Sequence, residues 1–363
     1  MPFVQRFNEF KLFQPTAEEA SAAMVTLPER QELNRRYLEK NLASGDGGDA
    51  VGTSPAPLQM SITGSFISAH APDYIGVPTL HWTVEEWRKE FRAMRACGID
   101  TVVFQAAAWR ELEECYFPSE VLSAYEQFDV LTPLVEAASS EKMTLFLGAL
   151  GSVSGWDLQN EEKTRREIEM HQAVLKELAD RYGSRISGFY FPCETAFRGE
   201  RKPEHETQYS RILEVYCRTA RELLPGKAVV MSPSSKYFEG KEDEFLACWS
   251  HIFSIAAPDI LAPQDSIGCG GCNLTNQAAM WQLWKRLADD VRCRLWANIE
   301  LFERRVFGGE APFDAASPER VRMQIANVQP YVEKCICWEF SYFANGDAKG
   351  ASSLHTLLSD LTD

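Results

Sequence analysis

The chain has 363 residues, 45% of them hydrophobic and 25% charged, and its formal net charge is −15. This balance excludes a largely disordered chain and a collagen-like one, and no run of residues approaches the ~18–20 apolar residues of a membrane span. The acidic charge repels phosphate backbones and anionic membrane surfaces, so we expect neither nucleic acid nor a membrane as a partner.

The first residues carry no export signal. Met1 to Arg6 are followed by Asn8, Glu9 and Lys11, so the apolar segment of a secretory signal is missing. We therefore expect a cytoplasmic protein. In a reducing cytosol, the ten cysteines are expected to be mostly buried, small apolar residues rather than disulfides.

Residues 1–57 differ in composition from the rest of the chain. Thr16 begins a Thr-Ala-Glu-Glu stretch that resembles a capping box, and a helical pattern rich in Arg, Glu and Leu continues to about Asn41. Residues 43–57 are rich in Gly, Ser, Asp and Pro, which is typical of a linker. We predict a helical extension with a linker over 1–57 and the main domain over 58–363.

From residue 58 onward, short apolar runs alternate with longer amphipathic segments. The runs are rich in Val, Ile, Phe or Tyr and are too short for typical helices, which predicts strands. They cover residues 59–67, 101–107, 143–150, 186–192, 228–232, 260–262, 295–299 and 335–340. The clearest helical patterns between them cover residues 83–96, 161–182, 207–224, 277–291 and 318–332.

Eight strand–helix units without a repeated motif predict a single (β/α)8 TIM barrel of the α/β class. The rival architecture is a doubly wound open sheet, which would want a G-x-G-x-x-G loop after its first strand. Residues 59–67 read Gln-Met-Ser-Ile-Thr-Gly-Ser-Phe-Ile and contain no such motif. The sequence therefore favours the barrel.

The active sites of such barrels lie at the carboxyl ends of the strands, and two acids stand out there. Glu194 follows the fourth predicted strand and Glu300 the seventh, each after a nearly uncharged run, where a carboxylate is costly unless it is hydrogen-bonded or used. Because these strands lie on opposite sides of the ring, the two side chains can face each other across the opening. Glycosidic bond cleavage needs such a pair, because one carboxyl protonates the leaving oxygen while the other attacks the anomeric carbon or activates water.

Other residues at the strand ends suit sugar binding. Aromatic faces on which sugar rings stack would come from Trp156, Trp296, Trp338, Tyr190 and Tyr237, and hydrogen bonds to hydroxyls from Gln105, Gln264 and Asp265. Asp265 is also a candidate for the water-activating base of an inverting pair with Glu194. The structural alternatives are a capping role in a turn for Asp265, and ion pairs with Arg198 for Glu194 and with Arg304 or Arg305 for Glu300.

Five stretches carry a resemblance to known proteins: Gly98-Ile-Asp-Thr-Val-Val-Phe-Gln105, Gly188-Phe-Tyr-Phe-Pro-Cys-Glu194, Ala262-Pro-Gln-Asp-Ser-Ile-Gly268, Trp296-Ala-Asn-Ile-Glu300 and Trp338-Glu-Phe340. From about residue 58 to 361 the chain resembles glycoside-hydrolase-like TIM barrels, with the closest likeness to an uncharacterised bacterial family of that architecture. The layout is also similar to the clan of retaining glycosidases with Glu after strands four and seven. That resemblance implies that Glu194 is the acid/base and Glu300 the nucleophile. One position departs from the clan, because Cys193 stands where an Asn usually precedes the acid/base.

These features predict a glycoside hydrolase that acts on small oligosaccharides or glycosides without a metal or an organic cofactor. A non-catalytic carbohydrate-binding barrel would keep the tryptophans without needing two facing carboxyls. A barrel lyase or isomerase acting on sugars would usually need a metal, a lysine base or a phosphate site, and Lys236 is the lysine close to a strand end. Cys269 and Cys272 form a C-x-x-C without a second pair at zinc spacing, so we interpret them as part of a Gly-rich loop.

Overall fold

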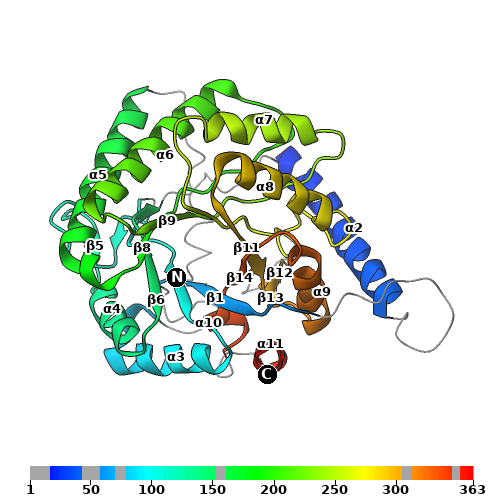
Figure 1. The fold of residues 1–363 in the computed structure, drawn as a ribbon, viewed down its shortest axis with the longest axis horizontal. Helices are drawn as coiled ribbons and strands as arrows, with labels where there is room; N and C mark the ends of the chain where they lie inside the picture. The colour runs from blue at the N-terminus through cyan, green and yellow to red at the C-terminus, as the bar shows by residue number, and fades with distance from the viewer. Residues whose placement is uncertain are drawn as a thin grey trace.

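The computed structural model describes residues 17–42, 58–69, 79–110, 112–151, 161–304, 313–345 and 352–362. Its centre is a closed barrel of eight strands, which neighbour one another in the order β1-β14-β11-β10-β9-β8-β6-β2 (Figure 1). All eight pairings are parallel, so all eight strands end on the same side of the barrel. The predicted (β/α)8 fold is confirmed.

Each barrel strand overlaps one of the eight predicted apolar runs. The strands are β1 (Ile62–Ile67), β2 (Thr101–Phe104), β6 (Thr144–Gly148), β8 (Gly188–Phe191), β9 (Ala228–Met231), β10 (Ile260–Leu261), β11 (Arg294–Glu300) and β14 (Lys334–Trp338). The barrel closes where the first strand meets the last, with Ile62 opposite Cys335. The other neighbour of β1 is β2, and there Gly64 stands opposite Thr101.

Helices surround the barrel (Figure 1). They are α3 (Val84–Ala96), α4 (Leu131–Ser140), α5 (Glu161–Tyr182), α6 (Pro203–Leu223), α7 (Glu242–Ile252), α8 (Gln277–Val291), α9 (Pro318–Val328) and α11 (Ser352–Asp360), with the short α10 (Phe340–Phe343) after the last strand. The capping box that starts α3 joins Thr83 and Glu86, and Ser317 caps α9. The last helix of the five predicted, α9, ends earlier than expected because Pro330 has no amide hydrogen to continue it.

Short strands extend the barrel at the carboxyl ends of β2, β6 and β11. A four-stranded sheet has the order β5-β4-β3-β7, and β12 pairs with β13. Their bounds are β3 (Ala108–Trp109), β4 (Glu114–Cys115), β5 (Glu126–Gln127), β7 (Leu150–Gly151), β12 (Phe302–Arg304) and β13 (Phe313–Ala315). These two-to-three-residue strands carry no period of their own, which is why the sequence pattern does not predict them.

The barrel is filled with side chains. The interior cluster has at least one member from every strand, each at most 4% exposed: Phe66, Val103, Phe146, Tyr190, Val230, Ile260, Ala262, Trp296 and Ile336. The residues between them pack outward in a second cluster with the helices. Because side chains alternate along a strand, the residue two positions after each interior residue again points inward, one layer nearer the opening.

The helix α2 (Ala17–Leu42) is the expected N-terminal extension, and it packs against α9 (Figure 1). Asn34 accepts a hydrogen bond from the Leu274 N–H (2.8 Å), and the Gln31 amide donates to the Arg304 carbonyl (3.0 Å). The first bond reaches the loop after β10 and the second the end of β12, both on the carboxyl side of the barrel. The expected linker over 43–57 lies outside the described residues, and the division into an extension and a barrel domain stays a prediction.

All ten cysteines are free, and eight of them are buried, in agreement with the expected small apolar role. In the described part of the chain, no helix combines the length and the apolar character needed to cross a bilayer.

Candidate active site

A polar layer lies directly above the apolar interior of the barrel. It consists of the inward positions that follow the interior residues on six strands: Ser68, Gln105, Ser232, Gln264, Asn298 and Trp338. On one side, the Ser68 hydroxyl (3.0 Å) and the Trp338 indole N–H (3.3 Å) both donate to the Gln105 carbonyl oxygen. On the other side, the Asn298 amide donates to the Ser232 hydroxyl (3.1 Å). Polar groups thus begin where the apolar core ends.

Glu194 stands on this layer, three residues beyond β8. Its carboxyl has Gln264 as hydrogen-bond partner. Gln264 follows the interior residues Ile260 and Ala262 just after β10. The Glu194 side chain reaches solvent, yet the protein around it displaces enough water to raise the pKa of its carboxyl. The bond with Gln264 and the charges of Lys236 and Arg198 oppose that rise without cancelling it.

Glu300 is the last residue of β11 and is only 2% exposed. Its Oε2 accepts the Cys269 N–H (2.8 Å), so the loop after β10 closes over it. Gly268 permits this approach, because a Cβ there would stand 2.1 Å from the Phe302 carbonyl oxygen and 3.1 Å from Glu300 Oε2. Burial, followed by the charge of Asp265, raises the pKa of Glu300 to about 8.

Asp265 lies on the outer side of this strand end and not at the opening. Its Oδ1 accepts the Glu300 backbone N–H (3.2 Å), and its Oδ2 accepts the Gln324 amide of α9 (2.5 Å). Burial raises the pKa of Asp265 to about 6. The two carboxyls influence each other's titration, so the pair tends to hold one proton near neutral pH. The arrangement supports Asp265 as a group that controls the proton on Glu300.

The structure does not bring every predicted sugar-binding residue to the opening. Tyr190 and Trp296 belong to the barrel interior, and Trp296 lies near its amino end, where Arg294 and Lys334 contact the indole ring. The Tyr237 hydroxyl donates to Glu242 at the start of α7 (2.7 Å). Trp156 lies outside the described residues. Gln105, Gln264 and Trp338 are the predicted binding residues that share the polar layer.

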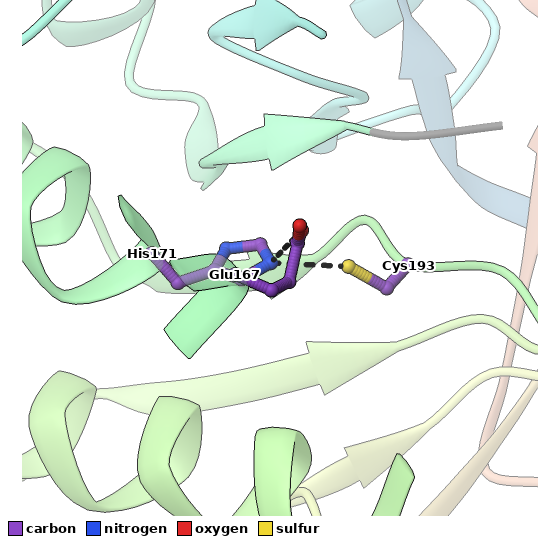
Figure 2. Close-up of side chains that lie close together, drawn as sticks. All are labelled: Glu167, His171 and Cys193. Carbon is purple, nitrogen blue, oxygen red and sulfur yellow. Dashed lines mark hydrogen bonds and ion pairs between the residues drawn. The ribbon is translucent and has the colours of Figure 1, made fainter. Parts of the chain in front are cut away.

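Cys193, the position that departs from the retaining clan, faces the helices instead of the barrel. Its Sγ lies 3.3 Å from His171 Nε2, and that nitrogen lies 3.2 Å from Glu167 Oε1 (Figure 2). Arg110 forms an ion pair with the other Glu167 oxygen. Burial alone would raise the pKa of Glu167, but His171 and Arg110 hold it below its usual value. Glu167 and His171 stand four residues apart on α5, a spacing that could have indicated a shared face.

This group has the chemistry of a metal site, because its three donor atoms lie within 4.8 Å of one another. The ion pair with Arg110 already neutralises the Glu167 carboxylate, and His171 Nδ1 has no hydrogen-bond partner in the described structure, whereas metal-bound histidines usually donate from that second nitrogen. We therefore interpret the group as a buried polar cluster, in which His171 Nε2 contacts both Cys193 Sγ and Glu167 Oε1 and so fixes Cys193. The Tyr209 hydroxyl, which donates to the Cys193 carbonyl oxygen (2.5 Å), fixes the same residue from α6.

Replacing Glu167 with Gln is expected to destabilise the fold by about 1–3 kcal/mol, because the partly exposed Arg110 loses its counter-ion and a buried acceptor oxygen is replaced by an NH2 group beside other donors. Urea unfolding of Glu167→Gln against the wild type measures the change. Glu169→Gln on the same helix is the matched control, since its exposed pair with Arg165 contributes about 0.5 kcal/mol or less. Equal losses of unfolding free energy in the two variants would contradict a structural role for the group of Glu167, His171 and Cys193.

Comparisons with known proteins agree with this architecture. Residues 62–349 match the model of a family described as a domain of unknown function, DUF4434. A search of curated proteins found no match to the chain.

Among solved structures, a putative alpha-L-fucosidase from Bacteroides thetaiotaomicron is 21% identical over 87% of this chain and 97% of its own, with a TM-score of 0.68. The beta-glucosidase from Thermotoga maritima is 11% identical over 81% and 91%, with a TM-score of 0.51. The beta-galactosidase from Marinomonas ef1 is 9% identical over 83% and 59%, with a TM-score of 0.55. These structures share the barrel fold with this chain.

Proposed function

The chain belongs to the family described as domain of unknown function DUF4434, and on that premise we propose that it is a glycoside hydrolase with Glu194 and Glu300 as its two carboxyl groups. The observation that carries the proposal is the pair of acids at the ends of β8 and β11, at the side of the barrel where the polar layer replaces the apolar core. The barrel structures of glycosidases that the chain resembles support it at the level of the fold.

Glu194 is suited to proton donation, because its pKa is raised while its carboxyl still reaches solvent. In the proposed reaction it protonates the glycosidic oxygen as that bond breaks. Glu300 then attacks the anomeric carbon, or activates a water that does so. Gln105, Gln264 and Trp338 provide hydrogen bonds and an aromatic face for the sugar.

The test is a screen of aryl glycosides and small oligosaccharides with the wild type and the variants Glu194→Gln and Glu300→Gln. We expect turnover by the wild type that falls sharply in both variants. Undiminished turnover in both would exclude this pair as the catalytic groups. The anomer formed first, read by NMR, distinguishes attack by Glu300, which retains configuration, from attack by an activated water, which inverts it.

A carbohydrate-binding barrel without catalysis is the second candidate, and the near-complete enclosure of Glu300, 2% exposed, favours it. It predicts saturable sugar binding with no turnover of any glycoside. The screen distinguishes the two candidates when it is paired with calorimetric titration of the same sugars.

Asp265→Asn is expected to increase kcat/KM at pH 7 by up to about tenfold. The charge of Asp265 helps to keep Glu300 protonated, and Glu300 must be ionised to attack. Each unit by which its pKa falls raises the ionised fraction about tenfold while most of the group is still protonated. Asn keeps the oxygen that accepts the Glu300 N–H. The pH dependence of kcat/KM for the two proteins measures the effect.

The same variant tests the alternative role of Asp265. If Asp265 were the water-activating base of an inverting pair with Glu194, Asp265→Asn would abolish turnover at every pH. A modest fall at pH 7 would instead indicate that Glu300 acts in its protonated form, as the proton donor.

A further inference from the structure

Three cations surround the side of the opening on which Glu194 lies. Arg198 follows Glu194 in the same loop, Lys236 is in the loop after β9, and Arg30 is on α2. Lys236 and Arg198 both act on the charge of Glu194, and Arg198 and Arg30 both act on the charge of Lys236. The described structure places no carboxylate within ion-pair distance of any of the three.

Contacts with two neighbouring loops hold Lys236 in this place. The N–H of Ser234, two residues earlier, donates to the Thr195 carbonyl (3.1 Å), and the Tyr237 N–H donates to the Gly271 carbonyl (3.3 Å). The Lys236 stem itself lies against Gly271, with its Cγ 3.5 Å from the place where a Cβ of Gly271 would stand. The side chain is half-buried, so its ammonium group stays near Glu194.

The charge of Glu194 stabilises the charged form of Lys236, but it does not offset the burial of Lys236 and the repulsion from Arg198. Partial burial, followed by repulsion from Arg198, lowers the pKa of Lys236. Nearby lysines and arginines outside the opening are paired, as Lys241 is with Glu244 and Arg201 with Glu206. Unpaired cations held together in a protein with a net charge of −15 are typical of a site whose counter-ion is a ligand.

We propose that Lys236 and Arg198 bind an anionic group of the substrate, so that the sugars this site takes are acidic ones, bearing a carboxylate or a sulfate. The proposal rests on the proposed function only in that the opening receives a carbohydrate. The guanidinium of Arg198 offers two parallel N–H donors to such a group, and Lys236 offers a point charge. Arg30 adds to the positive field from the side of α2.

The experiment compares 4-nitrophenyl glucoside and galactoside with the corresponding glucuronide, galacturonide and 6-sulfates. We expect the anionic member of a series to have a KM lower than its neutral partner by on the order of ten- to a hundredfold. A preference for the uronides identifies the carboxylate as the ligand, and a preference for the 6-sulfates identifies the sulfate. Raised salt should weaken the preference because it screens the charges.

Lys236→Met and Arg198→Gln should each raise the KM for the anionic compound by about tenfold or more relative to the KM for the neutral compound. Because both charges also act on Glu194, the comparison uses the ratio of the two KM values and not kcat. Lys241→Met, which removes a lysine outside the opening, is the matched control and should change neither KM. Because Met keeps the buried stem and removes an unpaired charge, Lys236→Met should unfold at the same temperature as the wild type or higher. Equal KM values for neutral and anionic sugars, or a KM unaffected by both substitutions, would overturn the proposal.

Calorimetric titration with the methyl glycosides of the same sugars separates this proposal from the proposed function. Anionic methyl glycosides that bind the wild type but not Lys236→Met support the cation site even if no glycoside is hydrolysed. In that result the hydrolase proposal alone would fail. Hydrolysis of neutral glycosides together with no discrimination in binding would overturn the cation site alone.

Discussion

Glu194→Gln is expected to lower kcat by about 10²–10⁴-fold for glycosides whose alcohol is a poor leaving group. This is the range that a positioned proton donor contributes. The effect should shrink for glycosides whose leaving group departs as a stable anion, such as 2,4-dinitrophenolate. The reason is that such a group needs no proton as the bond breaks. Gln keeps the size and polarity of the side chain, so the KM should change little. Steady-state kinetics over a series of aryl glycosides measures both quantities.

The matched control is Glu200→Gln, which changes an exposed acid of the same loop and should leave the kinetics as they are. A loss of similar size for every leaving group would remove Glu194 from proton donation, since a merely structural disturbance affects all substrates alike. Circular dichroism of the variants verifies that the fold is intact.

Glu300→Gln is expected to abolish turnover, with a loss on the order of 10⁴-fold or more, because the attacking oxygen or the base for water disappears. This loss should not depend on the leaving group. Glu303→Gln is a useful contrast, since Glu303 pairs with Arg320 behind the site. It should lower stability while leaving kcat nearly unchanged.

Glu300→Gln should also make the protein more stable than the wild type, and the difference should increase as the pH rises from 5 to 8. In the fold the pKa of Glu300 is raised to about 8, whereas an unfolded glutamate ionises near pH 4.5. Between these values the folded chain binds more protons than the unfolded chain, so this group reduces the free energy of unfolding as the pH increases. Gln cannot ionise and removes that slope. Unfolding temperatures of both proteins at pH 5 and pH 8 test the sign, and a variant less stable than the wild type at pH 8 would contradict the burial of a protonated Glu300.

Most of the barrel follows from local pattern. The eight apolar runs became the eight barrel strands, and the segments 161–182 and 277–291 match α5 and α8 to the residue. The helices α4 and α7, of 10 and 11 residues, were not among the clear patterns. Val130 and Lys241 stand at their N-caps without a side-chain cap, whereas Ser317 marks the start of the equally short α9. The additional strands β3 to β5 depend on pairing between loops, which no local pattern encodes.

The candidate site was less accessible to sequence reasoning. Position in the chain singled out Glu194 and Glu300 as candidates, because both come within two residues of the end of an apolar run. It could not tell which aromatic side chains face the opening. Trp296 and Glu300 are four residues apart on β11, so both side chains point to the same face of the strand. Trp296 nevertheless lies among the interior residues, and Glu300 lies at the end of the strand. Depth along a strand depends on barrel register, which is a property of the closed ring.

The contact of His171 and Glu167 with Cys193 could not be predicted from the sequence either. Their contact joins a helix to the strand that follows it, and the distance between them depends on how α5 packs on the barrel. The expectation for Cys193 rested only on its difference from Asn in a resembling clan. Its actual surroundings required coordinates.

The opposite orientation of Cys193 and Glu194 has a consequence for how reliably the barrel assembles. A shift of β8 by one residue against its neighbours would exchange the two, sending the thiol to the opening and the carboxylate into the apolar shell beside Glu167. The second carboxylate would be buried beside Glu167, whose counter-ion Arg110 is already paired, and a buried charge without its own partner costs several kcal/mol. A barrel with β8 in the wrong register is therefore less stable because of the residue that we propose for catalysis. Keeping Glu194 for the reaction also favours the correct strand register.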